Sequence, residues 1–305
     1  MTLAEILQYP VRSEGSAPLI TVAMPVYNAG RLLQPALMSI VKQTCTDWEF
    51  LVIDDGSTDG SLEFISHIKD ARIRVIKDGL NKGLAARLNE AIDLARGRYF
   101  ARMDCDDISY PERFARQVEA LERDSSLDLV GARAIAISQD DQIIGLFPYA
   151  LNHKDLCAKP WRGFYIAHPT WMGRIEWFRH HRYAIPAPYL CEDQELLLRS
   201  FNTSQFGVVA DVTFAYRVRS KVDWPKLMRV RRSVLRMQVH HFMRTKQAGY
   251  GVLALLVYIG RITMDSFSCI LQASRASTFV GYRGAVDAAT ANKWRDVLKT
   301  IFSVP

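Results

Sequence analysis

The chain has 305 residues, of which 49% are hydrophobic and 23% are charged. This composition is sufficient to bury one substantial core with an appendage, and it excludes a mainly disordered chain. The net charge of +7 is unevenly distributed along the sequence. Residues 1–220 carry 25 basic and 28 acidic side chains, a net charge of −3, whereas residues 221–305 carry 14 and 4, a net charge of +10.

The first residues of the sequence and its cysteines indicate the cellular compartment in which the protein is expected. A secretory signal needs a basic start followed by an apolar stretch, and residues 1–15 have neither. The five cysteines are an odd number, and none of them are paired at the spacing of zinc ligands. We therefore expect a protein that is made and stays on the cytoplasmic side, with reduced cysteines.

Short apolar runs rich in β-branched residues alternate with amphipathic stretches over the first part of the chain. This alternation predicts an α/β fold with a mainly parallel central sheet flanked by helices. Apolar residues at helical spacing predict helices over residues 33–41 and 84–95. The four predicted strands are Leu19–Ala23, Phe50–Ile53, Ile73–Ile76 and Tyr99–Met103.

Acidic residues directly follow the second predicted strand. In open sheets of this kind, ligands bind at the carboxyl ends of the strands. Asp54 and Asp55 stand at such an end, where a carboxylate can accept hydrogen bonds from a nucleobase or from ribose hydroxyls. A turn followed by a helix cap is the structural alternative, since Asp, Gly, Ser and Thr are common in both.

Three carboxylates within four residues follow the fourth predicted strand: Asp104, Asp106 and Asp107. Such groups repel one another unless a cation lies between them. Carboxylate oxygens are hard ligands that suit Mg²⁺ or Mn²⁺. The pattern therefore predicts a divalent metal site, with a solvated acidic loop as the alternative.

Four segments of the first half form a pattern, namely Thr21–Asn28, Asp54–Asp59, Asn81–Leu84 and Ala101–Asp107. In order and spacing they resemble the inverting family 2 glycosyltransferases of the GT-A fold. Singly they are weak or moderate signals, but jointly they cover about the first 110 residues, and a looser match continues to Arg219.

The resemblance implies a nucleoside-diphosphate sugar as donor and a divalent metal, Mn²⁺ or Mg²⁺, as cofactor. Asp106 is then the direct metal ligand, and Asp104 lies nearer the ribose. The order of residues around Arg87 departs from the family pattern, so its contact with the diphosphate or base rests on a weaker match. The implied donor-binding residues are Pro25, Tyr27, Asn28, Asp54, Asp55, Asn81, Gly83, Arg87 and Asp104.

Two later segments look like the acceptor-side motifs of the same family. They imply that Asp193 is the catalytic base and that Glu192 helps to hold the acceptor. His168 is either an acceptor contact or a buried histidine with its hydrogen bonds satisfied. Trp171, inside the histidine motif, is the aromatic residue expected to contact the acceptor, since aromatic faces suit sugar rings. The chemistry needs such a base, because a sugar hydroxyl becomes a good nucleophile only as a carboxylate takes its proton. The alternative for Glu192 and Asp193 is the acidic first turn of a helix, which the helix dipole favours.

The basic tail predicts a helical C-terminal region that is distinct from the catalytic domain. Ten Lys and Arg lie between residues 217 and 246, on a pattern typical of a basic amphipathic helix. An apolar run over residues 247–260 has 14 residues, fewer than the roughly 20 that a spanning helix needs. Extending it would place Arg261 and Asp265 in a bilayer, so we expect an interfacial or core helix.

Two interpretations of this region stay open, namely peripheral membrane contact through residues 217–272 and a solvated helix packed on the catalytic domain. The expected organisation is an N-terminal extension over residues 1–18, a GT-A glycosyltransferase domain over residues 19–220 and a basic, partly apolar helical region over residues 221–305.

The sequence thus predicts a metal-dependent, inverting hexosyltransferase of cell-surface polysaccharide biosynthesis. Its expected acceptor is a glycan or a polyprenyl-linked saccharide, at the inner face of the cytoplasmic membrane. One alternative is a nucleotidyltransferase acting on sugar phosphates. A nucleic-acid-binding protein is the other, suggested by the basic tail, but no nucleic acid is expected because the strand-end acids would repel phosphates.

Overall fold

The structure is a computed structural model that describes residues 17–218, 223–270 and 286–302. Its centre is one sheet of nine strands, in the order β3-β2-β1-β4-β8-β6-β9-β5, with β7 paired to β6. The strands are β1 Ile20–Val26, β2 Trp48–Asp54, β3 Ile73–Lys77, β4 Tyr99–Arg102, β5 Ile108–Ser109, β6 Leu129–Ile137, β7 Ile143–Leu146, β8 Met172–Arg174 and β9 Phe206–Arg217.

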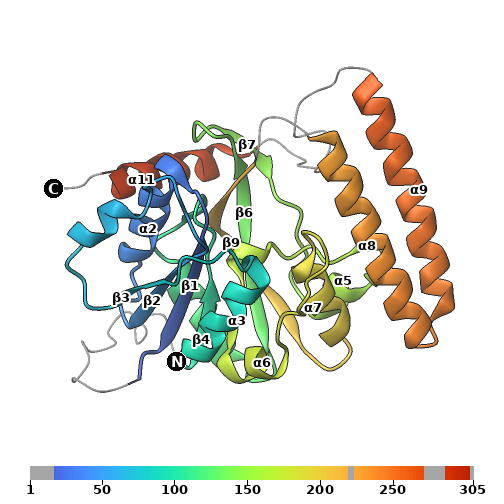
Figure 1. Cartoon of the computed structure of the whole chain (residues 1–305), viewed down its shortest axis with the longest axis horizontal. Helices are drawn as coiled ribbons and strands as arrows, with labels where there is room; N and C mark the ends of the chain where they lie inside the picture. The colour runs from blue at the N-terminus through green and yellow to red at the C-terminus, as the bar shows by residue number, and fades with distance from the viewer. Residues whose placement is uncertain (1–16, 219–222, 271–285, 303–305) are drawn as a thin grey trace.

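Helices cover both faces of this sheet (Figure 1). The α-helices are α2 Leu33–Val41, α3 Leu84–Leu94, α4 Arg113–Arg123, α5 His153–Cys157, α6 Ile175–His180, α7 Glu192–Ser200, α8 Trp224–Arg244, α9 Ala248–Ile270 and α11 Ala288–Phe302. The short 3₁₀ helices are η1 Gly30–Leu32, η2 Glu63–His67, η3 Pro160–Arg162 and η4 His168–Thr170.

The parallel half of the sheet confirms the predicted strands and helices. β1 pairs in parallel with both β2 and β4, and β2 pairs in parallel with β3. Successive side chains of a strand point to opposite faces. In β1, Val22 and Met24 pack into the core on one face, whereas Ala23 packs with α3 residues on the other. Because both of their faces are buried, β1, β2 and β4 are mainly apolar and do not alternate, whereas β3 at the edge of the sheet is partly exposed.

The second half of the sheet is mixed in direction. β6 and β9 run in parallel, and β8 pairs in antiparallel fashion with both β4 and β6. β5 pairs with β9, so the chain segment just after the acidic residues is tied into the sheet. Because β8 pairs with β4, the segment His168–Thr170, which ends just before β8, lies beside β4.

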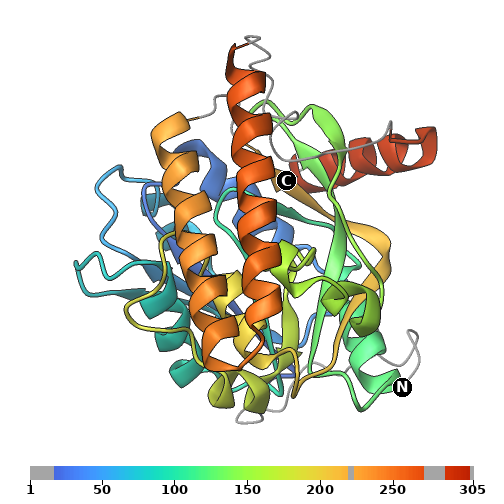
Figure 2. The same cartoon turned by 90° about the vertical axis from the view of Figure 1, so that its right-hand side faces the viewer.

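The C-terminal region packs in two separate places. α8 and α9 lie side by side and antiparallel on one side of the molecule (Figures 1 and 2). α11 instead returns to the sheet, where Trp294 stacks on Tyr110 with ring centroids 6.0 Å apart. Of the residues predicted for the N-terminal extension and for membrane contact, residues 1–16, 219–222 and 271–272 lie outside the described residues.

Candidate active site

The site residues predicted from the first half of the sequence meet at the carboxyl ends of β1, β2 and β4. Val26 and Asp54 are partners in the register of β1 and β2. The backbone N–H of Asp55 donates to Val26 O at 2.7 Å, and that of Met103 donates to Ala23 O at 3.0 Å. Parallel pairing therefore brings three loops, each following a strand, to one edge of the sheet.

The loop after β1 is tied to the loop after β2 by hydrogen bonds. The side-chain oxygen of Asn28 accepts from the Thr58 N–H at 2.8 Å, and the Asn28 N–H donates to Ser57 Oγ at 3.1 Å. Asp54 in turn accepts from the Ser57 N–H at 2.8 Å. Pro25 is buried beneath this loop, whereas the Tyr27 side chain is 53% exposed. The arrangement holds Tyr27 at the surface of the strand-end edge.

Asp55 is held by the loop that precedes α3 and by α3 itself. One of its oxygens accepts from the Lys82 N–H at 2.7 Å and from Arg87 Nε at 2.9 Å, and the Gly83 N–H donates to its other oxygen at 3.1 Å. Gly83 has a positive φ of 85° at the start of α3, which favours glycine. Asn81, next to this turn, is exposed.

The structure gives Arg87 a different place from the predicted contact with the donor. Its side chain is fully buried, and its remaining nitrogens bind Asp78 at 2.6 Å and Glu90 at 2.8 Å. Hydrogen bonds to Asp78, opposed by burial, raise the pKa of Arg87. With every nitrogen engaged by the protein, Arg87 acts as a positioning residue that fixes the Asp55 carboxylate.

We expect the Arg87→Met variant to lose about 3–5 kcal/mol of unfolding free energy, because it leaves the buried Asp55 carboxylate without its charged partner. Urea unfolding measures this loss. The matched control is Lys82→Met, which removes a pair to the same Asp78 from a side chain that is 41% exposed, so its effect should be below about 1 kcal/mol. Equal losses in the two variants would contradict the role assigned to Arg87.

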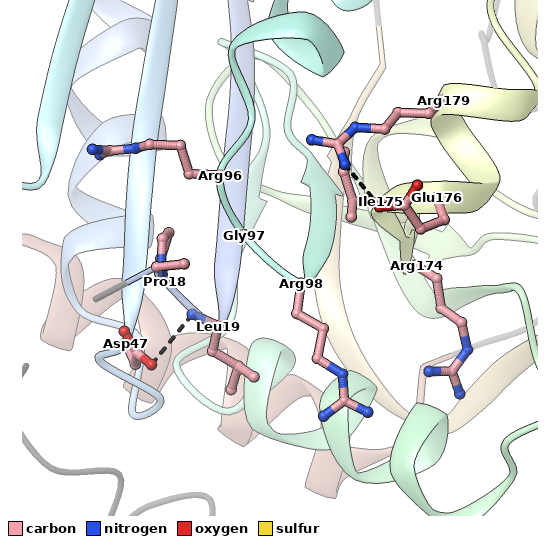
Figure 3. A pocket seen from close by; sticks show the side chains of 11 residues that line it. Pro18, Leu19, Asp47, Arg96, Gly97, Arg98, Arg174, Ile175, Glu176 and Arg179 are labelled. Atoms are coloured by element: carbon pink, nitrogen blue, oxygen red, sulfur yellow. Dashed lines mark hydrogen bonds and ion pairs between the residues drawn. The ribbon is translucent and has the colours of Figure 1, made fainter. Parts of the chain in front are cut away.

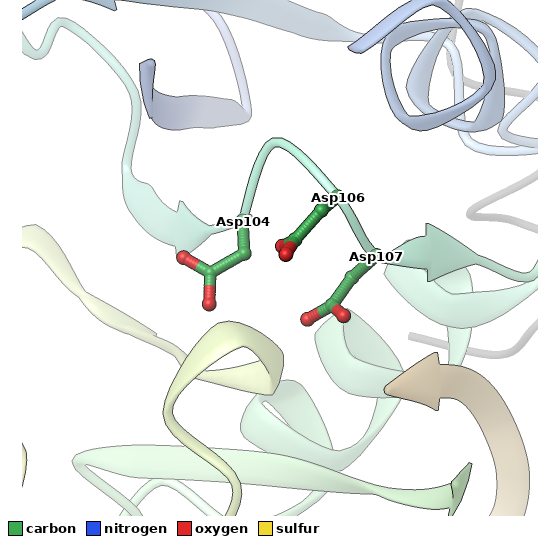
Figure 4. A group of neighbouring side chains, drawn as sticks. All are labelled: Asp104, Asp106 and Asp107. Atoms are coloured by element: carbon green, nitrogen blue, oxygen red, sulfur yellow. The ribbon is translucent and has the colours of Figure 1, made fainter. Parts of the chain in front are cut away.

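The acidic loop after β4 brings three carboxylates together (Figure 4). Asp104, Asp106 and Asp107 each offer one carboxylate oxygen, and these three oxygens lie within 4.8 Å of one another. Asp107 is buried, and one of its oxygens accepts from the Arg217 N–H at 2.7 Å. Its Oδ2 is buried with no hydrogen-bond partner among the described residues. Burial, followed by the charges of Asp106 and Asp104, raises the pKa of Asp107 well above its usual range.

These residues fit a divalent cation. The donor set consists of carboxylate oxygens, which Mg²⁺ and Mn²⁺ prefer. The unsatisfied Asp107 oxygen and the mutual repulsion of the three groups are both costs that a cation would remove. Arg217 Nε also donates to the backbone oxygen of Asp106 at 2.7 Å, so the loop is fixed by the end of β9.

The acceptor-side residues meet at the start of α7. Glu192 and Asp193 are the first two residues of this helix, so the acidic first turn expected as the alternative is also present. Burial, followed by the charge of Asp193, raises the pKa of Glu192 to about 7. Burial likewise raises the pKa of Asp193. A carboxylate with a raised pKa at this position is a stronger proton acceptor than an exposed one.

Gln194 connects this turn to the neighbouring loop. Its side-chain oxygen accepts from the Phe164 N–H at 2.9 Å, and its amide nitrogen donates to Phe164 O and to Asp193 Oδ2, both at 3.2 Å. The Asp193 carboxylate is therefore oriented by a residue that is itself anchored on both sides.

Arg102 pairs with the acidic loop and interacts electrostatically with the carboxylates at the start of α7, and sequence analysis did not single it out. Its side chain is 2% exposed, and its Nη2 binds Asp104 at 2.7 Å. Its Nε and Nη1 are buried without a hydrogen-bond partner among the described residues. Burial opposes its charge, but Asp104, Glu192 and Asp193 are among the anionic groups that raise the pKa of Arg102. The sequence did offer one sign of its importance, since Arg102 is a charged residue at the end of the otherwise apolar strand β4.

His168 lies on the same side of the site. Its Nε2 is 2.7 Å from the Tyr183 hydroxyl, and its Nδ1 is 3.8 Å from Glu192 Oε1. Burial, followed by the Arg102 guanidinium, lowers the pKa of His168 well below its usual range, so the imidazole is neutral. The structure thus brings together His168 and Glu192, which come from the two predicted acceptor-side segments.

Trp171 does not provide the aromatic surface expected for the acceptor. It is fully buried in the core, with its ring 4.5 Å from that of His168. It therefore supports His168 from beneath. Two exposed aromatic residues near α7 are Tyr165, whose side chain is 42% exposed, and Tyr189, which is 38% exposed and has the Arg229 guanidinium 5.0 Å from its ring centre.

A cavity of about 600 Å³ lies away from these residues, at the amino ends of β1 and β4 (Figure 3). Its arginines are already engaged by the protein. Arg179 pairs with Glu176 at 2.7 Å, Arg98 pairs with Glu122 at 2.7 Å, and Arg174 donates to backbone oxygens. Ligands of such sheets bind at the opposite end of the strands, so this cavity is not the candidate active site.

The sheet order, the acidic loop at the end of β4 and the carboxylates of α7 define the class of a GT-A glycosyltransferase. TarS of S. aureus in complex with UDP superposes with a TM-score of 0.59 over 92% of this chain and 79% of that chain. At 18% identity, this likeness shows the fold alone.

The chain belongs to glycosyl transferase family 2, whose model matches residues 21–182. This range contains β1 to β4, the acidic loop and the His168 segment. It ends before Glu192 and Asp193.

Two curated relatives are each similar to less than half of this chain. EpsE of Bacillus subtilis is 38% identical over 128 residues, which are 41% of this chain and 46% of that protein. WfgD of Escherichia coli, a UDP-Glc:alpha-D-GlcNAc-diphosphoundecaprenol beta-1,3-glucosyltransferase, is 31% identical over 129 residues, or 42% of this chain and 50% of that protein. The matches thus span about half of the length of these relatives.

Proposed function

We propose that the protein transfers a sugar from a nucleoside-diphosphate sugar to a hydroxyl of a glycan or lipid-linked saccharide, with inversion of configuration. The observation that carries this proposal is the presence of two acidic groups that both act electrostatically on the buried Arg102: the Asp104–Asp107 loop on the donor side and Glu192–Asp193 on the acceptor side. Family membership favours sugar transfer over the nucleotidyltransferase alternative.

The nucleotide would lie along the carboxyl ends of β1, β2 and β4. Tyr27 is the exposed ring available to a base, and the oriented Asp54 and Asp55 carboxylates are acceptors for base or ribose groups. Pro25 and Asn28 would shape the loop around the base. Asn81 and Gly83 belong to the same edge, through the turn that binds Asp55.

Asp106 and Asp104 are the residues that would hold the divalent metal, with Asp107 beside them. When bound, such an ion neutralises part of the diphosphate charge and favours its departure. Arg102 would keep the Asp104 carboxylate directed toward the donor, because its Nη2 binds that group.

Asp193 is the proposed general base. In a direct displacement, the acceptor oxygen forms a bond to the anomeric carbon while the bond from that carbon to the phosphate oxygen breaks. The hydroxyl proton passes to the Asp193 carboxylate, and the nucleoside diphosphate leaves with the electron pair. Attack from the face opposite the leaving group gives inversion. Glu192 and the neutral His168 would bind the acceptor, since both can form hydrogen bonds with its hydroxyls.

A lipid-linked saccharide is the acceptor that we favour, in cell-surface polysaccharide assembly. The name of WfgD describes a diphosphoundecaprenol-linked acceptor, which supports this choice. An acceptor of that kind would place the protein at the inner face of the cytoplasmic membrane. The GT-A domain is proposed to cover residues 19–220, with the basic helical region after it.

Titration calorimetry of the full chain with a panel of UDP-, GDP- and dTDP-sugars tests the donor half of this proposal. We expect one donor to bind in Mn²⁺ or Mg²⁺ and to lose its affinity in EDTA, because its diphosphate needs the cation to approach the acidic loop. Binding of the same donor with equal affinity in EDTA would contradict metal dependence. Absence of binding by every donor would contradict the proposed function.

A further inference from the structure

The outer face of α9 is apolar along the helix up to Phe267. Val252 is 59% exposed, Leu256 58%, Ile259 51%, Met264 69% and Phe267 62%. These residues recur at helical spacing on the side turned away from the protein. Soluble proteins rarely expose a continuous apolar surface of this kind, unless it binds something. By length and composition, residues 248–267 of α9 form the one candidate membrane span among the described residues.

The two charged residues of α9, Arg261 and Asp265, both face inward. Asp265 is buried and pairs with Arg231 of α8 at 3.1 Å. Arg261 donates to the backbone oxygen of Arg162, in η3, at 2.9 Å. The charges that would oppose membrane contact are therefore used to attach α9 to the protein. A helix attached in this way lies along the surface of the protein, and its free side alone is available to a lipid phase.

The neighbouring helix α8 supplies positive charge. Between Trp224 and Lys246 the sequence has no acidic residue. Arg229, Arg232, Arg236 and Arg244 are all exposed on α8, and Lys246 is exposed in the turn that follows it. Figure 2 shows α8 and α9 next to each other at the surface of the same side of the molecule. An apolar stripe beside a row of cations is the pattern of helices that lie in the plane of an anionic membrane.

We propose that α8 and α9 together form a membrane-docking surface, with the outer side of α9 in the acyl boundary and the exposed arginines of α8 on anionic lipid headgroups. Arg217, which was included in the basic tail, is buried at the end of β9 and is not part of this surface. The occupant is a lipid bilayer with net negative charge, because a partner surface must complement both the apolar and the cationic residues.

The docking surface is next to the acceptor side of the active site. Cys191, which precedes α7, has its Sγ 3.4 Å from Ser233 Oγ of α8. Arg229 of α8 lies over the ring of Tyr189, as described above. A bilayer bound at α8 and α9 would therefore lie near Glu192 and Asp193, where a lipid-linked acceptor is needed. The link between membrane docking and a lipid-linked acceptor rests on the proposed function. The docking surface itself is inferred from exposure and charge alone.

Co-sedimentation of the full chain with phosphatidylcholine vesicles, with and without about 30 mol% of the anionic lipid phosphatidylglycerol, tests the proposal. We expect binding to the anionic vesicles that weakens in high salt. Leu256→Glu/Phe267→Glu should lower the partition constant at least about tenfold, because it places two charges in the acyl boundary. Arg232→Glu/Arg236→Glu should lower it similarly, but for anionic vesicles alone.

Two control variants each make the same kind of change at a single exposed residue elsewhere on the protein. Leu151→Glu removes an exposed leucine outside the docking surface, and Lys69→Glu reverses an exposed lysine on the loop after η2. Both should bind vesicles within about twofold of the unmodified protein, since neither lies at the membrane. Equal vesicle binding by the Leu256→Glu/Phe267→Glu variant and the unmodified protein would overturn the proposal.

Sedimentation velocity without lipid addresses the other occupant of this face, a second copy of the chain. A stable dimer that the Leu256→Glu/Phe267→Glu variant dissociates would overturn the membrane proposal, whereas a monomer supports it. Donor calorimetry on the same variants separates this inference from the proposed function. Lost vesicle binding with intact donor binding supports the docking surface, and vesicle binding by a protein that binds no donor would refute the proposed function alone.

Discussion

The Asp193→Asn variant is expected to bind the donor as tightly as the unmodified protein but to turn over about 1,000-fold more slowly. The amide keeps the size of the side chain and its contact with Gln194, but it cannot accept the proton of the acceptor hydroxyl. General base catalysis typically contributes about 100- to 10,000-fold to a rate. Release of nucleoside diphosphate under saturating donor and acceptor measures turnover, and calorimetry measures donor affinity.

Glu195→Gln is the matched control for this variant. It makes the same carboxylate-to-amide change in the same helical turn, at a residue paired with Arg199 on the outside of α7. We expect turnover within about twofold, because Glu195 does not face the site. Near-normal turnover of Asp193→Asn would refute the assignment of the base.

The pH profile of turnover gives an independent readout of the same pair. Glu192 and Asp193 titrate together, so the apparent pKa belongs to both. Their raised pKa means that the carboxylate forms are lost as the pH falls, and the pKa of Glu192 is about 7. Turnover of the unmodified protein should therefore fall as the pH drops below about 7, and this fall should be absent in Asp193→Asn.

The Asp106→Ala variant is expected to lose metal-dependent donor binding, with affinity at least about 100-fold lower, or about 2.7 kcal/mol. Removal of this carboxylate leaves the cation with fewer hard ligands where the diphosphate must bind. Calorimetry with the donor that binds the unmodified protein in Mn²⁺ measures the loss. The matched control is Asp140→Ala, which removes an exposed aspartate that pairs with Arg31 and should keep full affinity.

Thermal unfolding provides a second test of the metal site without turnover. A cation that binds the folded state alone raises the melting temperature of the unmodified protein in Mn²⁺ relative to EDTA. Asp106→Ala should show no such difference. In EDTA it should melt no earlier than the unmodified protein, since one of three mutually repelling charges is gone. A metal-dependent melting temperature that persists in Asp106→Ala would contradict the role of this residue.

Much of the parallel half of the fold could be predicted, because β1, β2 and β4 are buried on both faces and read as short, mainly apolar runs. The edge strand β3 is partly exposed, but its β-branched residues Ile73, Val75 and Ile76 still indicate a strand. The four predicted strands correspond to β1, β2, β3 and β4. β6 and β9 were not predicted. Arg133 interrupts the apolar residues of β6 and Asp211 interrupts those of β9, and the register of the pair shifts near Arg133. Neither strand therefore reads as a short continuous apolar run.

The candidate site was predictable where a residue stands directly at a strand end, and less so where packing decides its role. The parallel pairing of β1 with β2 and β4 places the acids that follow these strands at one edge of the sheet, namely Asp54, Asp55 and the Asp104–Asp107 loop. The role of Arg87 depends on three carboxylates from separate segments, and the burial of Trp171 depends on the core beneath His168. The role of Arg102 can be recognised only in the structure, where the charges of Glu192 and Asp193 act on it.

The position of α11 determines how far this protein could be shortened and still fold. Trp294 and Ile301 pack with Tyr110 and Ile135 in one cluster, and the Trp294 ring nitrogen donates to Asp141 O at 2.9 Å. A fragment that stops after β9 would expose those side chains to water immediately beyond the acidic loop. The smallest fragment worth expressing therefore extends through Phe302, although the motifs that identify the family end more than a hundred residues earlier.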